Sequence, residues 1–293
     1  MTAFASSSQG GLCWLASYPK SGNTWFRIVL RACLSEDPVD AIDLDAIQTG
    51  AIASSRVWVD DILGFDTSDL TQDEVMRLRP SVYRWTAAQG ASGYHKIHDA
   101  YSLTPDGVPL IGDRTTRAVI YLLRNPLDVA PSLAYHLGTD MDTAIARMGD
   151  RNFALSRARH GLSGQLLQRL GTWSDHVSSW VDACGVPVHV VRYEDMLSDP
   201  QSAFAAAFSH LGLTISPERL AQAIEAGRFE RLATLEAERG FRERSKKAER
   251  FFRRGQAGGW RDTLSPEQVQ QIIADHRAVM ARFGYLDARG APL

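Results

Sequence analysis

A lysine and a serine follow directly on a short apolar run near the start of the chain. In YPKSGNTW, residues 18–25, Lys20 and Ser21 stand between an apolar stretch at 11–17 and a stretch at 25–32 whose apolar residues recur at helical spacing. We therefore expect a β-strand, a tight loop and an α-helix. The first amides of a helix lack acceptors within it and lie at the positive end of its dipole, so this loop can bind an anion such as phosphate.

The loop differs from the Walker A phosphate loop, in which the lysine follows a glycine and the next hydroxyl binds Mg²⁺. Here Lys20 precedes Ser21 and Gly22. A second apolar run, RAVIYLL at 117–123, ends in Arg124, where a magnesium-dependent kinase often carries an aspartate. A P-loop kinase or another ATP-dependent phosphotransferase stays open as the main alternative function. A nucleotide-binding protein without catalytic activity is the second alternative.

His98 is one of eight histidines, and a lone histidine is more often structural than catalytic. His98 lies in YHKIHDAY, residues 94–101, which predicts a short strand with Lys96 and His98 on the same face. A neutral imidazole can accept the proton of an attacking hydroxyl, because histidine titrates near neutral pH.

Strands alternate with helices along the chain, which indicates an α/β fold with a mainly parallel central sheet. Helix starts are predicted by a capping box at Thr71 and Glu74, by Asn125 before Pro126, and by Ser265 before a proline. The expected further elements are a strand at 186–195 and helices at 71–85, 173–184, 200–213 and 217–235. Residues 35–64 show too little periodicity for an assignment. Residues 140–165 are polar and weakly periodic, and we expect a mobile lid or surface insertion there.

The composition is typical of a soluble globular protein, and the length allows one large domain or two ordinary ones; we expect a single domain spanning residues 1–293. The net charge of -2 gives no reason to expect nucleic acid or an anionic membrane as a partner. The three cysteines are scattered and lie in apolar segments, so reduced thiols are expected in place of disulfides or a zinc site. No signal peptide or membrane span is recognisable, and a cytoplasmic location is expected.

Three signatures together give the chain a resemblance to a known family. YPKSGNTW, LLRNPLDVAPS at 122–132 and RRGQAGGWRD at 253–262 occur in the order found in cytosolic-type sulfotransferases, and YHKIHDAY and VRYEDM at 191–196 fit the same pattern. The resemblance covers roughly residues 15–262. It implies a P-loop-like three-layer fold, with a parallel sheet flanked by helices. It also implies 3′-phosphoadenosine 5′-phosphosulfate (PAPS) as donor, 3′,5′-adenosine bisphosphate (PAP) as product, and no metal.

The resemblance implies roles for particular residues. Lys20, Lys96 and His98 match the catalytic residues of the family, and through the Lys-x-His signature His98 matches its general base. The residues matching the binding site for the 5′-phosphosulfate are Lys20, Ser21, Gly22, Asn23 and Thr24. Those matching the adenine contacts are Trp25, Tyr193 and Phe229, and those matching the 3′-phosphate ligands are Arg124, Ser132, Arg253, Arg254 and Gly255. Arginine suits a phosphate site because its planar fork of donors can contact two oxygens.

Some positions depart from the family pattern. Asn23 stands where animal members usually have threonine and bacterial members often have asparagine. Gly227 and Arg228 replace a small hydroxyl residue before Phe229. No dimerisation motif of the animal type is recognisable, so no oligomeric state is predicted. The expected acceptor is a small or medium-sized molecule with a phenolic or alcoholic hydroxyl, such as a natural product. Candidates for lining its pocket are Trp58, Tyr83, Trp85 and Tyr101.

Overall fold

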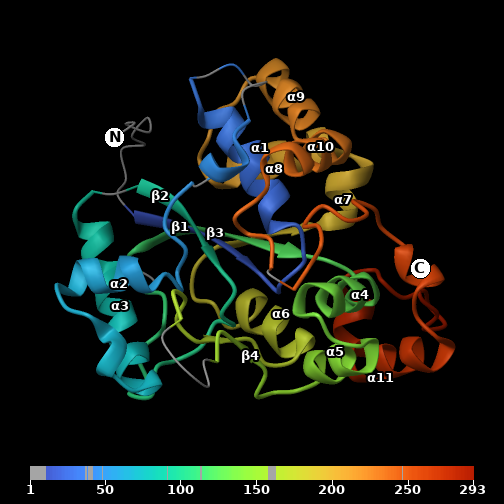
Figure 1. Cartoon of the computed structure of the whole chain (residues 1–293), viewed down its shortest axis with the longest axis horizontal. Helices are drawn as coiled ribbons and strands as arrows, with labels where there is room; N and C mark the ends of the chain where they lie inside the picture. The colour runs from blue at the N-terminus through green and yellow to red at the C-terminus, as the bar shows by residue number, and fades with distance from the viewer. Residues whose placement is uncertain are drawn as a thin grey trace.

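A four-stranded parallel sheet forms the centre of the molecule (Figure 1). The computed structural model describes residues 11–36, 38, 42–47, 49–90, 92–112, 114–157, 163–245 and 247–293. The strand order is β2-β1-β3-β6, and the strands are β1 (Gly11–Ser17), β2 (Ser92–Ile97), β3 (Thr116–Leu123) and β6 (Val188–Arg192). All three pairings are parallel. The predicted α/β architecture is confirmed.

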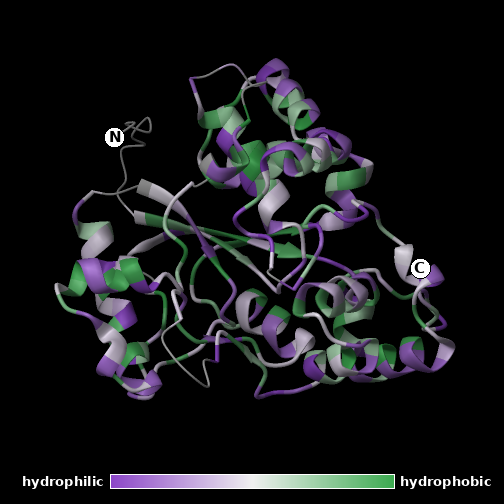
Figure 2. Ribbon diagram, in the orientation of Figure 1, coloured by the Kyte–Doolittle hydropathy of each residue, from purple (hydrophilic) through white to green (hydrophobic). Residues whose placement is uncertain are grey.

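Helices cover both faces of the sheet, because alternate residues of its buried strands point to opposite sides. Leu12, Trp14 and Ala16 of β1 belong to the core cluster beneath one group of helices, whereas Cys13 and Leu15 belong to the cluster beneath the other. The first group comprises α3 (Gln72–Ala88), α4 (Pro126–Leu137), α6 (Trp173–Val181) and α11 (Pro266–Arg282). The second comprises α1 (Asn23–Leu34), α8 (Pro200–His210) and α9 (Pro217–Ala226). Figure 2 shows hydrophobic and hydrophilic residues alternating around these helices, as expected for helices that cover a sheet with one face.

The three capped helix starts predicted from the sequence are confirmed. Thr71 and Glu74 form a reciprocal capping box at α3, and Ser265 forms one with Gln268 at α11. The Asn125 side chain accepts a hydrogen bond from the Leu127 amide at 3.0 Å and caps α4. Such caps satisfy backbone donors that the helix itself leaves unpaired. Because only a few residue types can do this, caps can be recognised in the sequence.

Other elements had no clear signal in the sequence. They are the helices α2 (Arg56–Leu63) and α5 (Met141–Met148), the 3₁₀ helices Leu44–Ala46, Thr67–Asp69 and Gly259–Asp262, and the short antiparallel strands β4 (Ala154–Leu155) and β5 (Gln168–Arg169). The strand predicted at 186–195 ends at Arg192, where helix α7 (Tyr193–Ser198) begins. The helix predicted at 217–235 is two helices, α9 and α10 (Phe229–Arg239), separated by Gly227 and Arg228. Helix α5 lies inside the segment 140–165 and buries Ala144, Ile145 and Met148. Residues 158–162 of that segment lie outside the described residues, and its mobility stays a prediction.

The carboxyl ends of β1 and β3 meet at the point where the strand order reverses. The chain continues from β1 into β2 on one side and returns to β3 on the other. In open parallel sheets this switch point is where ligands bind.

Within the described residues, no helix is both long and apolar enough to cross a bilayer. Cys13, Cys33 and Cys184 are free thiols, as expected.

Candidate active site

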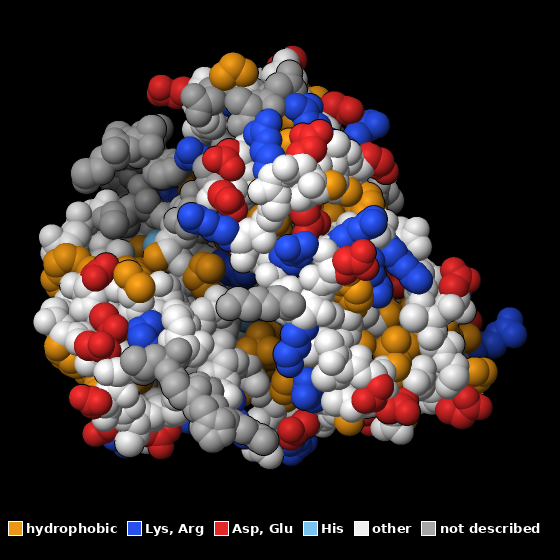
Figure 3. All heavy atoms as spheres, viewed as in Figure 1, with side chains coloured by type: hydrophobic (Ala, Val, Ile, Leu, Met, Phe, Trp, Pro, Cys, Tyr) orange, Lys and Arg blue, Asp and Glu red, His pale blue; other side chains and the backbone are white. Residues whose placement is uncertain are grey.

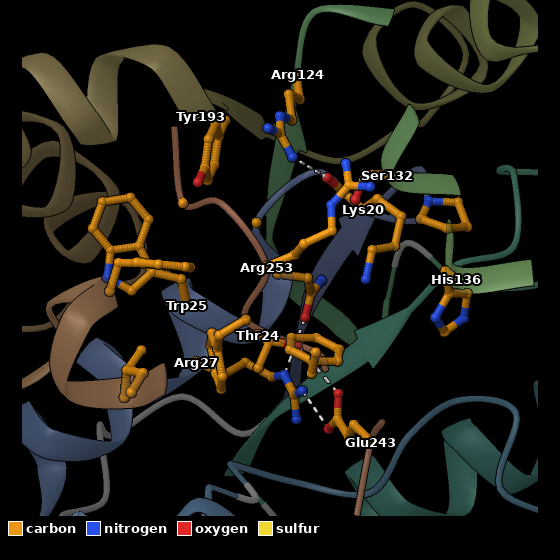
Figure 4. Close-up of a pocket in the computed structure, with 18 of the residues that line it drawn as sticks. Lys20, Thr24, Trp25, Arg27, Arg124, Ser132, His136, Tyr193, Glu243 and Arg253 are labelled. Carbon is orange, nitrogen blue, oxygen red and sulfur yellow. Dashed lines mark hydrogen bonds and ion pairs between the residues drawn. The ribbon is translucent and has the colours of Figure 1, made fainter. Parts of the chain in front are cut away.

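A pocket of about 860 Å³ lies at the carboxyl ends of β1 and β3, a volume typical of small-molecule sites. It is bounded by the loop after β1, the first turn of α4, helix α10 and the glycine-rich segment 251–259. Figure 3 shows Lys and Arg side chains gathered around a hollow on this face, and Figure 4 shows the lining residues converging on it. The local charge contrasts with the slightly negative net charge of the chain.

The loop after β1 turns sharply into α1. Lys20 and Gly22 both have positive φ, at 72° and 94°. A Cβ on Gly22 would lie 2.7 Å from Cδ2 of Tyr193, so only glycine fits beside that ring. None of the described side chains caps the amino end of α1, which leaves its first amides available to a ligand. The Ser21 hydroxyl is buried and has no hydrogen-bond partner among the described residues.

Arg124 joins the early loop to the late glycine-rich segment. Its guanidinium donates to the Lys20 carbonyl at 3.1 Å and to the Gln256 carbonyl at 3.0 Å, and it stacks 4.2 Å from the centre of the Tyr193 ring. The signatures around Lys20, Arg124 and Gly255 are far apart in the sequence but meet in one site (Figure 4).

Several cations surround the Lys20 ammonium. Burial, together with the nearby charges of Lys96, Arg124 and Arg253, lowers the pKa of Lys20 to about 8, although Glu243 opposes the shift. The ammonium lies 4.3 Å from the centre of the Phe251 ring, a cation–π contact. Such crowding of positive charge favours the binding of a polyanion.

The side chain of His98 is held in one tautomer. Its Nδ1 lies 2.8 Å from the Ser17 carbonyl oxygen, which can only accept, so Nδ1 carries the proton and Nε2 is left as the basic nitrogen. Burial, assisted by the Lys96 charge, holds the pKa of His98 well below its usual range. The carbonyl of His98 in turn accepts from His176 Nε2 at 3.0 Å, which fixes the backbone at this point. His98 therefore presents a neutral imidazole to the pocket.

A family model described as the sulfotransferase domain matches residues 12–284, nearly the whole chain. The chain belongs to the sulfotransferase family. The predicted family, enzyme class, donor and product are thereby confirmed: the chain is a PAPS-dependent sulfotransferase that releases PAP.

Relatives of this sulfotransferase are similar over most of its length. Cytosolic sulfotransferase 17 of Arabidopsis thaliana is 23% identical over 274 residues, which cover 88% of this chain and 71% of the relative. Flavonol 3-sulfotransferase of Flaveria bidentis is 22% identical over 275 residues, with coverages of 88% and 78%. The crystal structure of mouse sulfotransferase SULT7A1 complexed with PAP matches with a TM-score of 0.57 and 16% identity, covering 98% of this chain and 88% of that one. The structural match shows a shared fold.

The pocket of this sulfotransferase gathers nearly all the predicted catalytic and donor-binding residues. Ser21 is the exception: it lies in the same loop but does not line the pocket. The lining residues among the predictions are Lys20, Gly22, Asn23, Thr24, Trp25, Lys96, His98, Arg124, Ser132, Tyr193, Phe229, Arg253, Arg254 and Gly255. Arg253 stacks on Tyr135, whereas Arg254 donates to the Gly259 carbonyl and to the Thr263 hydroxyl. Arg254 thus also holds the glycine-rich segment in place.

The residues present fit the donor. The Ser21 hydroxyl, the Nε of Arg124 and the indole nitrogen of Trp25 are all buried and lack a hydrogen-bond partner among the described residues. Buried polar groups without partners are costly, so they commonly indicate where a ligand or water binds. Two of these groups belong to predicted phosphate sites and one to the predicted adenine site. No group of three His, Cys, Asp or Glu side chains in the described ranges is placed to hold a metal ion.

Sequence reasoning missed three charged residues of the site, namely Arg27, Asp128 and Glu243. Glu243 accepts hydrogen bonds from Arg27, Lys96 and Thr24 inside the pocket. The buried carboxylate of Asp128 accepts from the amides of Gly258 and Trp260, at 2.7 and 3.0 Å, and so fastens the glycine-rich segment to α4. Asp128 lies in a recognised signature and could have been flagged, whereas no spacing signal connects Glu243 to Arg27.

The four aromatic candidates for the acceptor pocket were wrong. Trp58, Tyr83, Trp85 and Tyr101 do not line this pocket. Tyr83 is buried and donates to the Ala53 carbonyl, Trp58 stacks on His95, and Tyr101 packs on Trp180. Tyr83, Trp58 and Tyr101 belong to the core around α3 and α6, whereas Trp85 is 50% exposed. An aromatic residue in a sequence carries no sign of whether it faces a core, a ligand or solvent.

Gly255→Ala is expected to destabilise the folded protein by about 2–4 kcal/mol, because a φ of 62° is strained for alanine and the new Cβ would lie 2.2 Å from Cδ2 of Phe229. Gly64→Ala is the matched control, since Gly64 has a φ of 76° but an added Cβ there would meet no atom within 4 Å among the described residues. Urea unfolding measures the loss in free energy of unfolding for each variant. The difference between the two variants separates the cost of the steric contact with Phe229 from the cost of backbone strain. Equal free energies of unfolding would show that Phe229 does not require glycine at this position.

Proposed function

We propose that this sulfotransferase transfers the sulfuryl group of PAPS to a hydroxyl of a small or medium-sized acceptor, with His98 as the general base. The observation that carries the proposal is the hydrogen bond between His98 Nδ1 and the Ser17 carbonyl, which leaves Nε2 free to accept a proton in the pocket. A neutral base is required because the acceptor oxygen must lose its proton as it attacks sulfur.

A hydrogen-bond network connects this base to the anion-binding loop. Asn23 donates to the Ser17 hydroxyl at 3.2 Å and to the Leu15 carbonyl at 2.9 Å, and accepts from Arg27 at 3.1 Å. The asparagine that replaces the threonine of animal members therefore ties the end of β1 to α1. The network supports a fixed geometry between the base and the donor, on which in-line transfer depends.

The two lysines supply charge where the reaction needs it. We assign Lys20 to the oxygen of the departing 5′-phosphate and Lys96 to the sulfuryl oxygens, because both ammonium groups line the pocket beside His98. Fixed positive charge next to a growing negative charge lowers the barrier without any reorganisation of solvent. No covalent intermediate with the protein is needed for such a transfer.

The remaining predicted residues bind the ends of the donor. Trp25 packs edge-to-face against Tyr193, with ring centres 5.9 Å apart, and both Trp25 and Phe229 line the pocket and pack against the same hydrophobic cluster, which supports an adenine site there. Arg124 and Ser132 of the α4 region face Arg253, Arg254 and Gly255, which supports a 3′-phosphate site. Its arginine forks suit a dianionic phosphate, and this phosphate distinguishes the donor from ATP.

The acceptor is proposed to lie beyond His98, where the pocket is lined by Ile52, Pro131, His136, Leu155 and Gln168. This mixed apolar and polar surface suits a small molecule that carries hydroxyl groups. The name of one relative, flavonol 3-sulfotransferase, supports a phenolic acceptor, and the names of the cytosolic relatives support a cytoplasmic location.

The donor assignment is tested by calorimetry with PAP and, separately, with ADP and Mg²⁺. We expect PAP to bind more tightly, because only PAP fills both phosphate sites. Tighter binding of ADP with Mg²⁺ would favour the phosphotransferase alternative. Incubation with PAPS and a panel of phenols, sugars and sterols, followed by mass spectrometry for sulfated products, identifies the acceptor class. PAP binding without transfer to any acceptor would favour the non-catalytic alternative.

A further inference from the structure

Glu243 places a negative charge inside a pocket built for anions (Figure 4). One of its carboxylate oxygens accepts from Arg27 at 2.5 Å, and the other accepts from Lys96 at 3.1 Å and from the Thr24 hydroxyl at 3.2 Å. Burial opposes the ionisation of this carboxyl, but Lys96 and Arg27 outweigh it and hold the pKa of Glu243 well below its ordinary value. The carboxylate is therefore charged at any working pH.

The partners of Glu243 are the groups assigned to the donor. Thr24 belongs to the predicted 5′-phosphosulfate loop and Lys96 to the predicted sulfuryl site, so this inference rests on the proposed function. Arg27 lies one turn further along α1, and its side chain is only 3% exposed. A buried guanidinium needs an anionic partner, and in this conformation Glu243 is that partner.

The donor and Glu243 cannot share these contacts. The 5′-phosphosulfate brings at least two negative charges, and like charges at hydrogen-bond distance repel strongly in a site shielded from water. The same donors cannot satisfy both groups, because Lys96 and Thr24 already direct hydrogen bonds to one oxygen of Glu243. One anion must leave when the other arrives.

We propose that Glu243 occupies the 5′-phosphosulfate subsite in the donor-free protein, and that the donor displaces it and takes over its contacts with Thr24, Arg27 and Lys96. Arg27 becomes a further cation of the donor site. The internal carboxylate keeps these cations paired and oriented while no donor is bound. It also weakens donor binding, since the site is competent only in the fraction of molecules in which Glu243 has moved away.

The test is calorimetric binding of PAP to Glu243→Gln. We expect the Kd of PAP to fall about tenfold, which corresponds to a subsite that Glu243 blocks about 90% of the time. Adenosine 3′-monophosphate lacks the 5′ group and should bind both proteins equally. Glu230→Gln is the matched control, because Glu230 is an exposed carboxylate of the same pocket that lies outside this cluster. An unchanged or higher Kd for PAP in Glu243→Gln would overturn the inference.

A crystal structure of the unmodified protein with PAP tests the same point without a variant. We expect the Glu243 carboxylate to have left Lys96 and Thr24, and Arg27 to contact the 5′-phosphate. PAP bound with the 3.1 Å contact between Glu243 and Lys96 still in place would overturn this inference alone. Failure of PAP to bind any of the proteins would overturn the proposed function as well.

Discussion

Replacing His98 by alanine is expected to lower kcat by about 10²- to 10⁴-fold, the usual contribution of a general base. The Kd of PAP should remain nearly unchanged, because Nδ1 of His98 bonds to the protein backbone and Nε2 is assigned to the acceptor. Steady-state kinetics and calorimetry measure the two quantities separately. Wild-type turnover in His98→Ala would remove the histidine from the mechanism.

The pH profile gives an independent check on this base. Because burial and the Lys96 charge hold the pKa of His98 well below its usual range, the imidazole stays neutral and basic in mildly acidic solution. We therefore expect kcat/KM to stay level as the pH falls through 6.5, the ordinary pKa of histidine. His136→Ala is a useful control, since His136 is a second histidine of the pocket and is not assigned a proton transfer. A loss of activity centred near pH 6.5 would contradict the buried environment described for His98.

Lys20→Met is expected to lower kcat by about 10²- to 10³-fold, as does the loss of other groups that stabilise charge in a transition state. The affinity for PAP should fall less, because the charge of Lys20 matters most when the bond to the leaving phosphate breaks. Methionine keeps the apolar length of the side chain beside Phe251. A variant that lost affinity and kept its kcat would assign Lys20 to ground-state binding only.

The same residue should make donor binding depend on pH. The pKa of Lys20 is lowered to about 8 in the free protein, and a bound anion must raise it again. PAP affinity is therefore expected to fall as the pH rises above 8, and near pH 8 the binding of PAP should be accompanied by uptake of a fraction of a proton by Lys20. Calorimetry in buffers of different ionisation enthalpy measures this uptake. It should disappear in Lys20→Met and persist in Lys247→Met, a control lysine that does not line the pocket.

The parts of the fold with strong local signals could be predicted without the structure. The strand at 11–17, the loop at Lys20 and the capped starts of α3, α4 and α11 were all correct, because a cap or an apolar run acts on its own neighbours. Helices α2 and α5 gave no such signal. Each buries only a few side chains, one in α2 and three in α5, so neither shows a long periodic pattern.

The sequence by itself determined the family, the donor and the 14 predicted residues that line the pocket, because each signature keeps its functional groups within one loop or one helix turn. Only the tertiary structure decided how these groups meet. It brought Glu243 onto Arg27, which precedes it by 216 positions, fixed the tautomer of His98 through the Ser17 carbonyl and excluded the aromatic residues around α3 from the pocket. Contacts between residues so far apart depend on how the sheet and helices pack, and no spacing along the chain records them.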